Sequence, residues 1–155
     1  MNQVKILPHV LDVARAGSDR WYVTNGATSV GPINLDLLLV IDNLLGMGIV
    51  FNGAIYNHHE LRAELSGMGY QFASTGDTEV IIKAWHAWGP ASLDRLYGMF
   101  AFALWERDSG VTWLVRDRLG IKPLYYAQDQ SRLRFASTLP ALLKGGGIDT
   151  TLDPQ

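Results

Sequence analysis

The sequence of 155 residues contains no cysteine. This absence excludes disulfide bonds, cysteine-ligated metal sites and a thiol nucleophile within the chain. Charged residues are also sparse, at 18% of the sequence, and the formal net charge is −2. Because no excess of positive charge is available to meet phosphates, neither nucleic acid nor an anionic membrane surface is an expected partner.

Long apolar runs are missing as well. The most apolar stretch, residues 35–51, is interrupted by Asp42 and two glycines, so it is too broken to span a bilayer. The start of the chain carries Pro8 and Asp12 within its apolar part and does not resemble a signal peptide. With 48% hydrophobic residues, the composition indicates a globular domain, which we expect in the cytoplasm.

The hydrophobic periodicity predicts an α+β fold. Helices are expected within residues 3–16, 58–69, 76–89, 90–97 and 140–147. Strands are expected at residues 35–41, 48–52 and 70–74, and hairpins at residues 98–117, at residues 123–137 and around Asn25-Gly26. This order of strands, helices and antiparallel hairpins is typical of helices packed on sheets.

Polar residues at the predicted helix starts invite local interpretations. Asn57 is expected to cap the helix that follows it, and Asp77 or Thr78 the next helix. His58 and His59 are interpreted as solvated neighbours that point apart, because no carboxylate pattern supports a metal site. The buried stripe of the second helix is predicted to be Val80, Ile81, Ala84, Trp85 and Trp88.

Five motifs follow one another along the chain: FNGAIYNHHELRAEL, GDTEVIIKAW, LYGMFAFALWER, RDRLGIKPLYYA and RFAST. In this order they resemble the class II glutamine amidotransferase domain of asparagine synthetase-like proteins, over residues 48–144. The resemblance implies an N-terminal nucleophile hydrolase-like fold, with two antiparallel sheets sandwiched between helices. It also implies release of ammonia from glutamine, which a synthetase domain uses with ATP to convert aspartate into asparagine.

The resemblance assigns roles to three residues. Amide hydrolysis passes through a tetrahedral oxyanion that needs fixed donors, and the side-chain amide of Asn52 and the backbone N–H of Gly53 are the expected donors. Asp77 matches the carboxylate that holds the α-ammonium of glutamine. Two plainer interpretations stay open, since Asn-Gly is the commonest hairpin dipeptide and Asp is a common helix cap. The RDRLGIKPLYY segment is interpreted as structural.

The chain departs from the family at the chemical centre. The family's nucleophile is an N-terminal cysteine whose own amino group acts as the base, whereas this chain has Asn2 and no cysteine. The opening strand that carries the nucleophile is expected to be missing. Leu37 stands where the family has an arginine for the α-carboxylate of glutamine, and Ala54 stands where a glutamate is usual.

We therefore expect a partial type-2-like amidotransferase domain over residues 1–147 and the start of a linker over residues 148–155. By descent its activity is glutamine hydrolysis for asparagine synthesis, but the chain is expected to be inactive and to bind glutamine weakly. It needs no cofactor, because ATP and Mg belong to the absent synthetase domain. Two alternatives stay open: a non-catalytic interaction module for a separate synthetase subunit, or a fragment of an active asparagine synthetase from an incomplete gene model.

Overall fold

The computed structural model describes residues 4–6, 12–15, 21–24, 29–30, 38–128, 133–145, 148 and 151. The chain divides into two compact units. The first contains Met1–His9 and Leu35–Pro123, and the second contains Val10–Asn34 and Leu124–Gln155. Both contain antiparallel sheets, and the predicted α+β class is confirmed.

The first unit is built on a five-stranded sheet in the order β1-β8-β7-β6-β5. All neighbouring strands in it are antiparallel. The central pair is long, and its register runs from Met47 opposite Glu106 to Ile55 opposite Gly98. The strands are β1 (Val4–Ile6), β5 (Leu38–Asp42), β6 (Met47–Ile55), β7 (Gly98–Glu106) and β8 (Thr112–Arg116).

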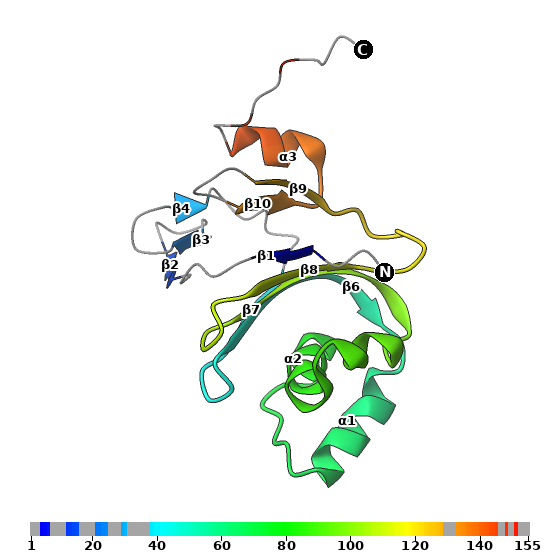
Figure 1. The fold of residues 1–155 in the computed structure, drawn as a ribbon. Helices are drawn as coiled ribbons and strands as arrows, with labels where there is room; N and C mark the ends of the chain where they lie inside the picture. Colours follow the sequence, from blue (N-terminus) through cyan, green and yellow to red (C-terminus); the bar gives the residue numbers. More distant parts are fainter. Residues whose placement is uncertain are drawn as a thin grey trace. The chain divides into compact units, whose positions relative to one another are not determined.

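The connection between β6 and β7 supplies the helices of this unit. They are α1 (His58–Gly67), α2 (Asp77–Trp88) and the 3-10 helix η1 (Gly89–Asp94). Both α-helices lie on the same side of the curved sheet (Figure 1). Gly89 ends α2 as predicted, with a positive φ of 57° that a glycine adopts without strain.

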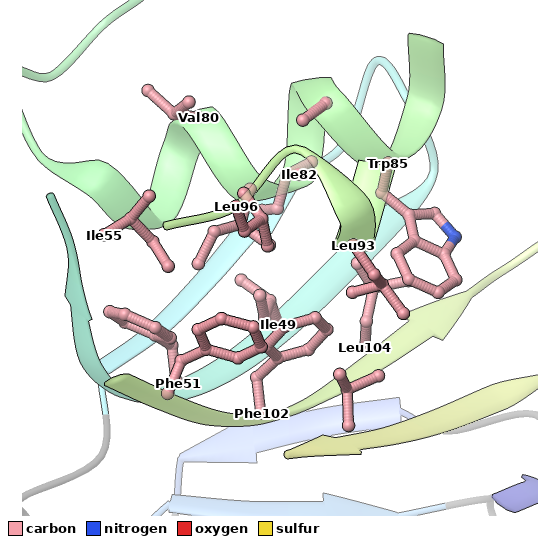
Figure 2. Close-up of a cluster of buried hydrophobic side chains, with 14 of the residues drawn as sticks. Ile49, Phe51, Ile55, Val80, Ile82, Trp85, Leu93, Leu96, Phe102 and Leu104 are labelled. Atoms are coloured by element: carbon pink, nitrogen blue, oxygen red, sulfur yellow. The ribbon is translucent and has the colours of Figure 1, made fainter. Parts of the chain in front are cut away.

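The core lies between α2 and this face of the sheet. Alternate residues of β6 and β7 point toward the helix because side chains along a strand alternate between faces (Figure 2). The predicted stripe of α2 is buried except at its end, where Trp88 is half-buried. The most deeply buried members of the core include Ile49, Ile55, Leu65, Val80, Ile82, Phe102, Leu104 and Val115.

The second unit contains two small sheets and a short helix. Its three-stranded sheet has the order β2-β3-β4, with β2 (Asp12–Arg15), β3 (Trp21–Thr24) and β4 (Ser29–Val30). The antiparallel pair β3–β4 agrees with the predicted hairpin, although Asn25 and Gly26 lie outside the described residues. The predicted later hairpin and helix are β9 (Tyr125–Gln128), β10 (Leu133–Ala136) and α3 (Leu139–Lys144).

The predicted helix over residues 3–16 is wrong. Val4–Ile6 forms β1, which pairs antiparallel with β8, and Asp12–Arg15 forms β2, which pairs with β3. An N-terminal strand therefore does lie beside β8, contrary to the expectation that it is missing. The apolar residues of this segment satisfy a strand as well as a helix, because short apolar runs do not distinguish the two.

The predicted strand at residues 70–74 is also wrong, since this segment is irregular. Its backbone N–H groups do not enter a sheet. Those of Ala73 and Ser74 donate instead to the Glu79 carboxylate, at 2.9 and 2.8 Å. A side chain five or six residues later thus replaces the partner strand.

The predicted helix caps need correction. Asn57 occupies the N-cap position of α1 but makes no capping hydrogen bond there. Its side-chain amide donates to the Arg95 carbonyl at 2.9 Å and accepts from the Tyr97 N–H at 3.0 Å, so it braces the start of β7. The N-cap of α2 is Gly76, and neither Asp77 nor Thr78 caps that helix.

Within the described ranges, no helix combines the length and the apolar character that crossing a membrane requires.

Candidate functional site

Asn52 and Gly53 lie inside β6, not in a turn. The simple-turn interpretation of Asn-Gly is therefore wrong. Gly53 has a φ of +152°, and a Cβ added to it would lie 2.1 Å from the Met99 carbonyl oxygen. The strand pair β6–β7 therefore needs a residue without a side chain at this position.

The backbone N–H of Gly53 faces away from β7. Opposite Gly53 lies Phe100, whose carbonyl accepts from the Asp117 N–H at 2.7 Å and whose N–H donates to the Asp117 carboxylate at 3.2 Å. Because both backbone groups of Phe100 are taken on the β8 side, the Gly53–Phe100 pair is a non-hydrogen-bonded one. The Gly53 N–H then points toward the β5 side of β6.

On that side the Gly53 N–H lies between two occupied positions. Phe51 is paired with Leu38, the first described residue of β5, and the Ile55 N–H donates to the Asp77 carboxylate at 2.9 Å. The described part of β5 begins at Leu38, so no described residue of that strand lies opposite Gly53. Successive N–H groups on one edge of a strand lie about 7 Å apart, so Gly53 and the Asp77 carboxylate share one short edge.

Asp77 is the first residue of α2 and is half-buried. Its Oδ2 atom accepts the Ile55 N–H, and no hydrogen bond to Oδ1 is found in the part of the chain that the structure describes. One carboxylate oxygen is thus fixed on the sheet while the other stays available to a cation. The N-cap interpretation of Asp77 is replaced by this contact between helix and strand.

Asn52 leaves the sheet on the opposite face. Its neighbours Phe51 and Ile55 point into the core beneath α2, so the alternation of β6 directs Asn52 the other way. The side chain is half-buried, and its amide makes no hydrogen bond to any described residue. The structure therefore offers two adjacent donors: the Gly53 N–H in the plane of the sheet and the Asn52 amide on one face of it.

Leu37, the expected replacement for an arginine, lies outside the described residues.

His58 is not merely solvated, as was expected. Its Nδ1 lies 2.8 Å from the Ile55 carbonyl oxygen, so Nδ1 donates there. The rings of His58 and His59 do not point apart, because their centroids lie 4.0 Å from one another. Ile55 is thus held at both backbone groups, by Asp77 at its N–H and by His58 at its carbonyl.

A buried charged cluster behind Asp77 was not foreseen. Glu79 accepts the Lys83 ammonium at 2.6 Å, and Lys83 lies 3.3 Å from Asp42 at the end of β5. Burial favours a raised pKa for Glu79, but Lys83 and the N–H groups of Ala73 and Ser74 outweigh it and lower that pKa to about 2. The spacing of four between Glu79 and Lys83 was the available sequence signal.

The RDRLGIKPLYY segment has the structural role that was predicted. The buried Asp117 carboxylate accepts the N–H groups of Phe100, Ile121 and Lys122. Burial favours a raised pKa for Asp117, but backbone N–H groups, with that of Lys122 foremost, hold the pKa below its ordinary value. Arg116 donates to the carbonyls of Gly120 and Lys122 and closes the same loop.

Two comparisons with known proteins agree on the family. A model of the glutamine amidotransferase domain matches residues 40–155. The chain is 39% identical over 105 residues to asparagine synthetase (glutamine-hydrolyzing) 3 of Bacillus subtilis, covering 68% of this chain and 17% of that protein. It is 38% identical over 154 residues to a putative asparagine synthetase (glutamine-hydrolyzing) of Mycobacterium tuberculosis, covering 88% of this chain and 24% of that protein.

A solved structure is similar as well. Glutamine phosphoribosylpyrophosphate amidotransferase of Bacillus subtilis superposes with a TM-score of 0.53 and 24% sequence identity, over 64% of this chain and 24% of that one. This likeness confirms the N-terminal nucleophile hydrolase-like fold. The chain spans about a quarter or less of the length of each of these three relatives. By its matching family model and its relatives, the chain belongs to the glutamine amidotransferase domain family.

Proposed function

We propose that this chain recognises glutamine at the β5-side edge of β6 without hydrolysing it. The Gly53 N–H and the Asn52 amide donate to the carbonyl of the side-chain amide, and Asp77 Oδ1 accepts the α-ammonium. One observation carries the proposal: the Ile55–Asp77 hydrogen bond of 2.9 Å places a carboxylate on the same edge of β6 as the Gly53 N–H, for which no partner is found among the described residues. That edge suits a ligand whose ammonium and carboxamide are separated by a short aliphatic chain.

The same donors are those that an oxyanion requires, but cleavage also needs an attacking group. The family's covalent step uses a cysteine, and the sequence has none. Without the thiol, the donors bind a carbonyl and no acyl-enzyme forms. We propose that the chain therefore releases no ammonia from glutamine.

The names of the relatives suggest the metabolic reaction to which this domain contributes. By descent, the domain belongs to the ammonia-supplying half of asparagine synthesis in the cytoplasm. ATP and Mg then act in a synthetase region or subunit, and no residue described here is assigned to them.

Calorimetric titration with L-glutamine, together with an assay of glutamate formation, tests the proposal. We expect weak binding that Asn52→Ala and Asp77→Ala each reduce further, and glutamate formation equal to a protein-free blank. Asp94→Ala is the matched control, since this exposed carboxylate pairs only with Arg118 among the described residues. Binding that neither site variant changes refutes the recognition site, and turnover that Asn52→Ala abolishes refutes the loss of catalysis.

A second candidate function is a non-catalytic interaction module for a separate synthetase subunit. Four apolar side chains are exposed where β6 ends, β7 begins and β8 ends: Tyr56 at 65%, Tyr97 at 67%, Leu119 at 85% and Ile121 at 55%. Exposed apolar groups gathered in this way mark interaction surfaces. Under this candidate, Tyr97→Ser and Leu119→Ser abolish co-sedimentation with a synthetase chain and leave glutamine binding unchanged. Unchanged co-sedimentation in both variants refutes it.

A further inference from the structure

The segment Ala73–Gly76 leads into Asp77 and is held from two sides. On one side, Arg62 of α1 donates to the carbonyls of Ser74 and Gly76, both at 2.7 Å. On the other side, the Glu79 carboxylate accepts the N–H groups of Ala73 and Ser74. Carbonyls and amides of one short segment are therefore taken by two side chains of opposite charge.

Arg62 is itself preorganised for this contact. Its guanidinium lies 4.3 Å from the centroid of the Phe72 ring, and both terminal nitrogens donate to carbonyls. A planar, forked donor stacked on an aromatic ring loses little freedom when it binds two acceptors. A lysine at this position has a single, freely rotating ammonium in place of two fixed nitrogens, so it holds the two carbonyls less rigidly.

Among the described residues, no other side chain binds the carbonyl groups that lead into α2. Its N-cap residue is Gly76, which offers no capping side chain, and glycine is the residue with the greatest backbone freedom. A small rotation at Gly76 moves the Asp77 carboxylate away from the Ile55 N–H. The hydrogen bond from Arg62 to the Gly76 carbonyl opposes that rotation.

We infer that Arg62 is a positioning residue for Asp77. It acts against Glu79 across Ala73–Gly76, so that Asp77 Oδ2 stays on the Ile55 N–H and Oδ1 faces the ligand's ammonium. The inference deepens the proposed function and rests on it for the identity of the ligand. The placement of the carboxylate is a property of the protein alone, so it is measurable without ligand.

Amide hydrogen exchange followed by NMR reads this placement directly. The Ile55 N–H is bonded to Asp77, while the N–H of the next residue, Tyr56, donates to the Tyr97 carbonyl at 2.7 Å. A global loss of stability accelerates exchange at both amides, whereas a displaced Asp77 accelerates it at Ile55 alone. In Arg62→Ala we expect exchange at Ile55 to accelerate about tenfold, which corresponds to about 1.4 kcal/mol, with Tyr56 unchanged.

Three further variants complete the experiment. Asp77→Ala sets the full effect at Ile55, and Arg62→Lys is expected to fall between it and the wild type. Glu64→Ala is the matched control on the same helix, because its exposed carboxylate pairs with Arg95 and does not touch the segment. Equal acceleration at Ile55 and Tyr56 in Arg62→Ala, or no acceleration at either, overturns the inference. If that variant does not fold, Arg62→Lys decides it by the same two amides.

Glutamine binding separates this inference from the function on which it rests. If the wild type binds glutamine, Arg62→Ala is expected to weaken binding by a factor similar to the acceleration at Ile55. If Arg62→Ala shows the expected exchange pattern but the wild-type chain binds no glutamine, the proposed function is refuted and the placement of Asp77 by Arg62 stands.

Discussion

Replacing Glu79 by alanine should lower the free energy of unfolding more than the loss of an exposed ion pair does. Its carboxylate accepts two backbone N–H groups, the Ser74 hydroxyl and the Lys83 ammonium, and its side chain is only 10% exposed. Removing it leaves Lys83, 6% exposed, with Asp42 at 3.3 Å as its remaining ion-pair partner among the described residues. Breaking one partner of a buried ion pair costs about 3–5 kcal/mol, a large part of the about 5–15 kcal/mol that stabilises a domain.

The pH dependence of unfolding reports on the same contacts of Glu79 in a second way. The folded-state pKa of Glu79 is about 2 against an ordinary value of 4.5. Because the pKa is lowered by folding, the ionised carboxylate contributes stability above pH 4.5 and loses it as the pH falls toward 2. A shift of this size corresponds to about 3 kcal/mol, and Glu79→Ala lacks that part of the acid destabilisation.

Urea unfolding followed by tryptophan fluorescence, at pH 7 and at pH 3, measures both effects. Glu64→Ala is the control, since its exposed pair with Arg95 is expected to contribute less than about 1 kcal/mol. Adding Lys83→Met to Glu79→Ala should recover part of the loss, because it removes the stranded charge. A loss below about 1 kcal/mol at pH 7, or an acid dependence identical to the wild type, refutes the reasoning.

Two further substitutions test the site's framework. Gly53→Ala should unfold the chain or destabilise it by more than about 3 kcal/mol, because the new Cβ would lie 2.1 Å from the Met99 carbonyl oxygen. Gly48→Ala in the same strand is the control, since its new Cβ would meet no atom closer than 3.7 Å. Thermal unfolding compares the two variants, and equal melting temperatures would contradict the predicted clash. Asp117→Asn should cost about 2 kcal/mol at pH 7 by urea unfolding and less as the pH falls below the ordinary aspartate pKa, since folding lowers the pKa of Asp117. Asp108→Asn, which is exposed, is its control, and a pH-independent loss counts against the assigned cause.

The parts of the fold that sequence predicted are those where periodicity and motif agree. Apolar residues at every second position predict the hairpin of β7 and β8. Apolar residues at helical spacing predict the buried stripe of α2 from Val80 to Trp85. The segment 70–74 is irregular although its sequence predicts a strand, because the N–H groups of Ala73 and Ser74 bind Glu79, and no local sequence pattern records that contact. The N-terminal strands were missed for a related reason, since pairing with β8 and β3 decides between helix and strand there.

The candidate site was predictable as a set of residues but not as a geometry. Asn52, Gly53 and Asp77 were named from motifs, yet the contact between Asp77 and Ile55 joins residues 22 positions apart. Arg62 carried no signal, because an arginine on a polar helix face is usually solvated. The carbonyls of Ser74 and Gly76 come within reach of Arg62 only when the segment after α1 has folded.

Two of the three candidate residues have a structural role that does not depend on a ligand. Gly53 is required by the close approach of β7, and Asp77 fastens the start of α2 to the end of β6. A glycine and an aspartate at these positions are therefore explained by the fold, even in a chain without a nucleophile. Asn52 differs, because its half-buried amide has no hydrogen-bond partner among the described residues. Among the described residues, no contact within the fold accounts for this amide, so Asn52 is the candidate residue that argues most directly for recognition.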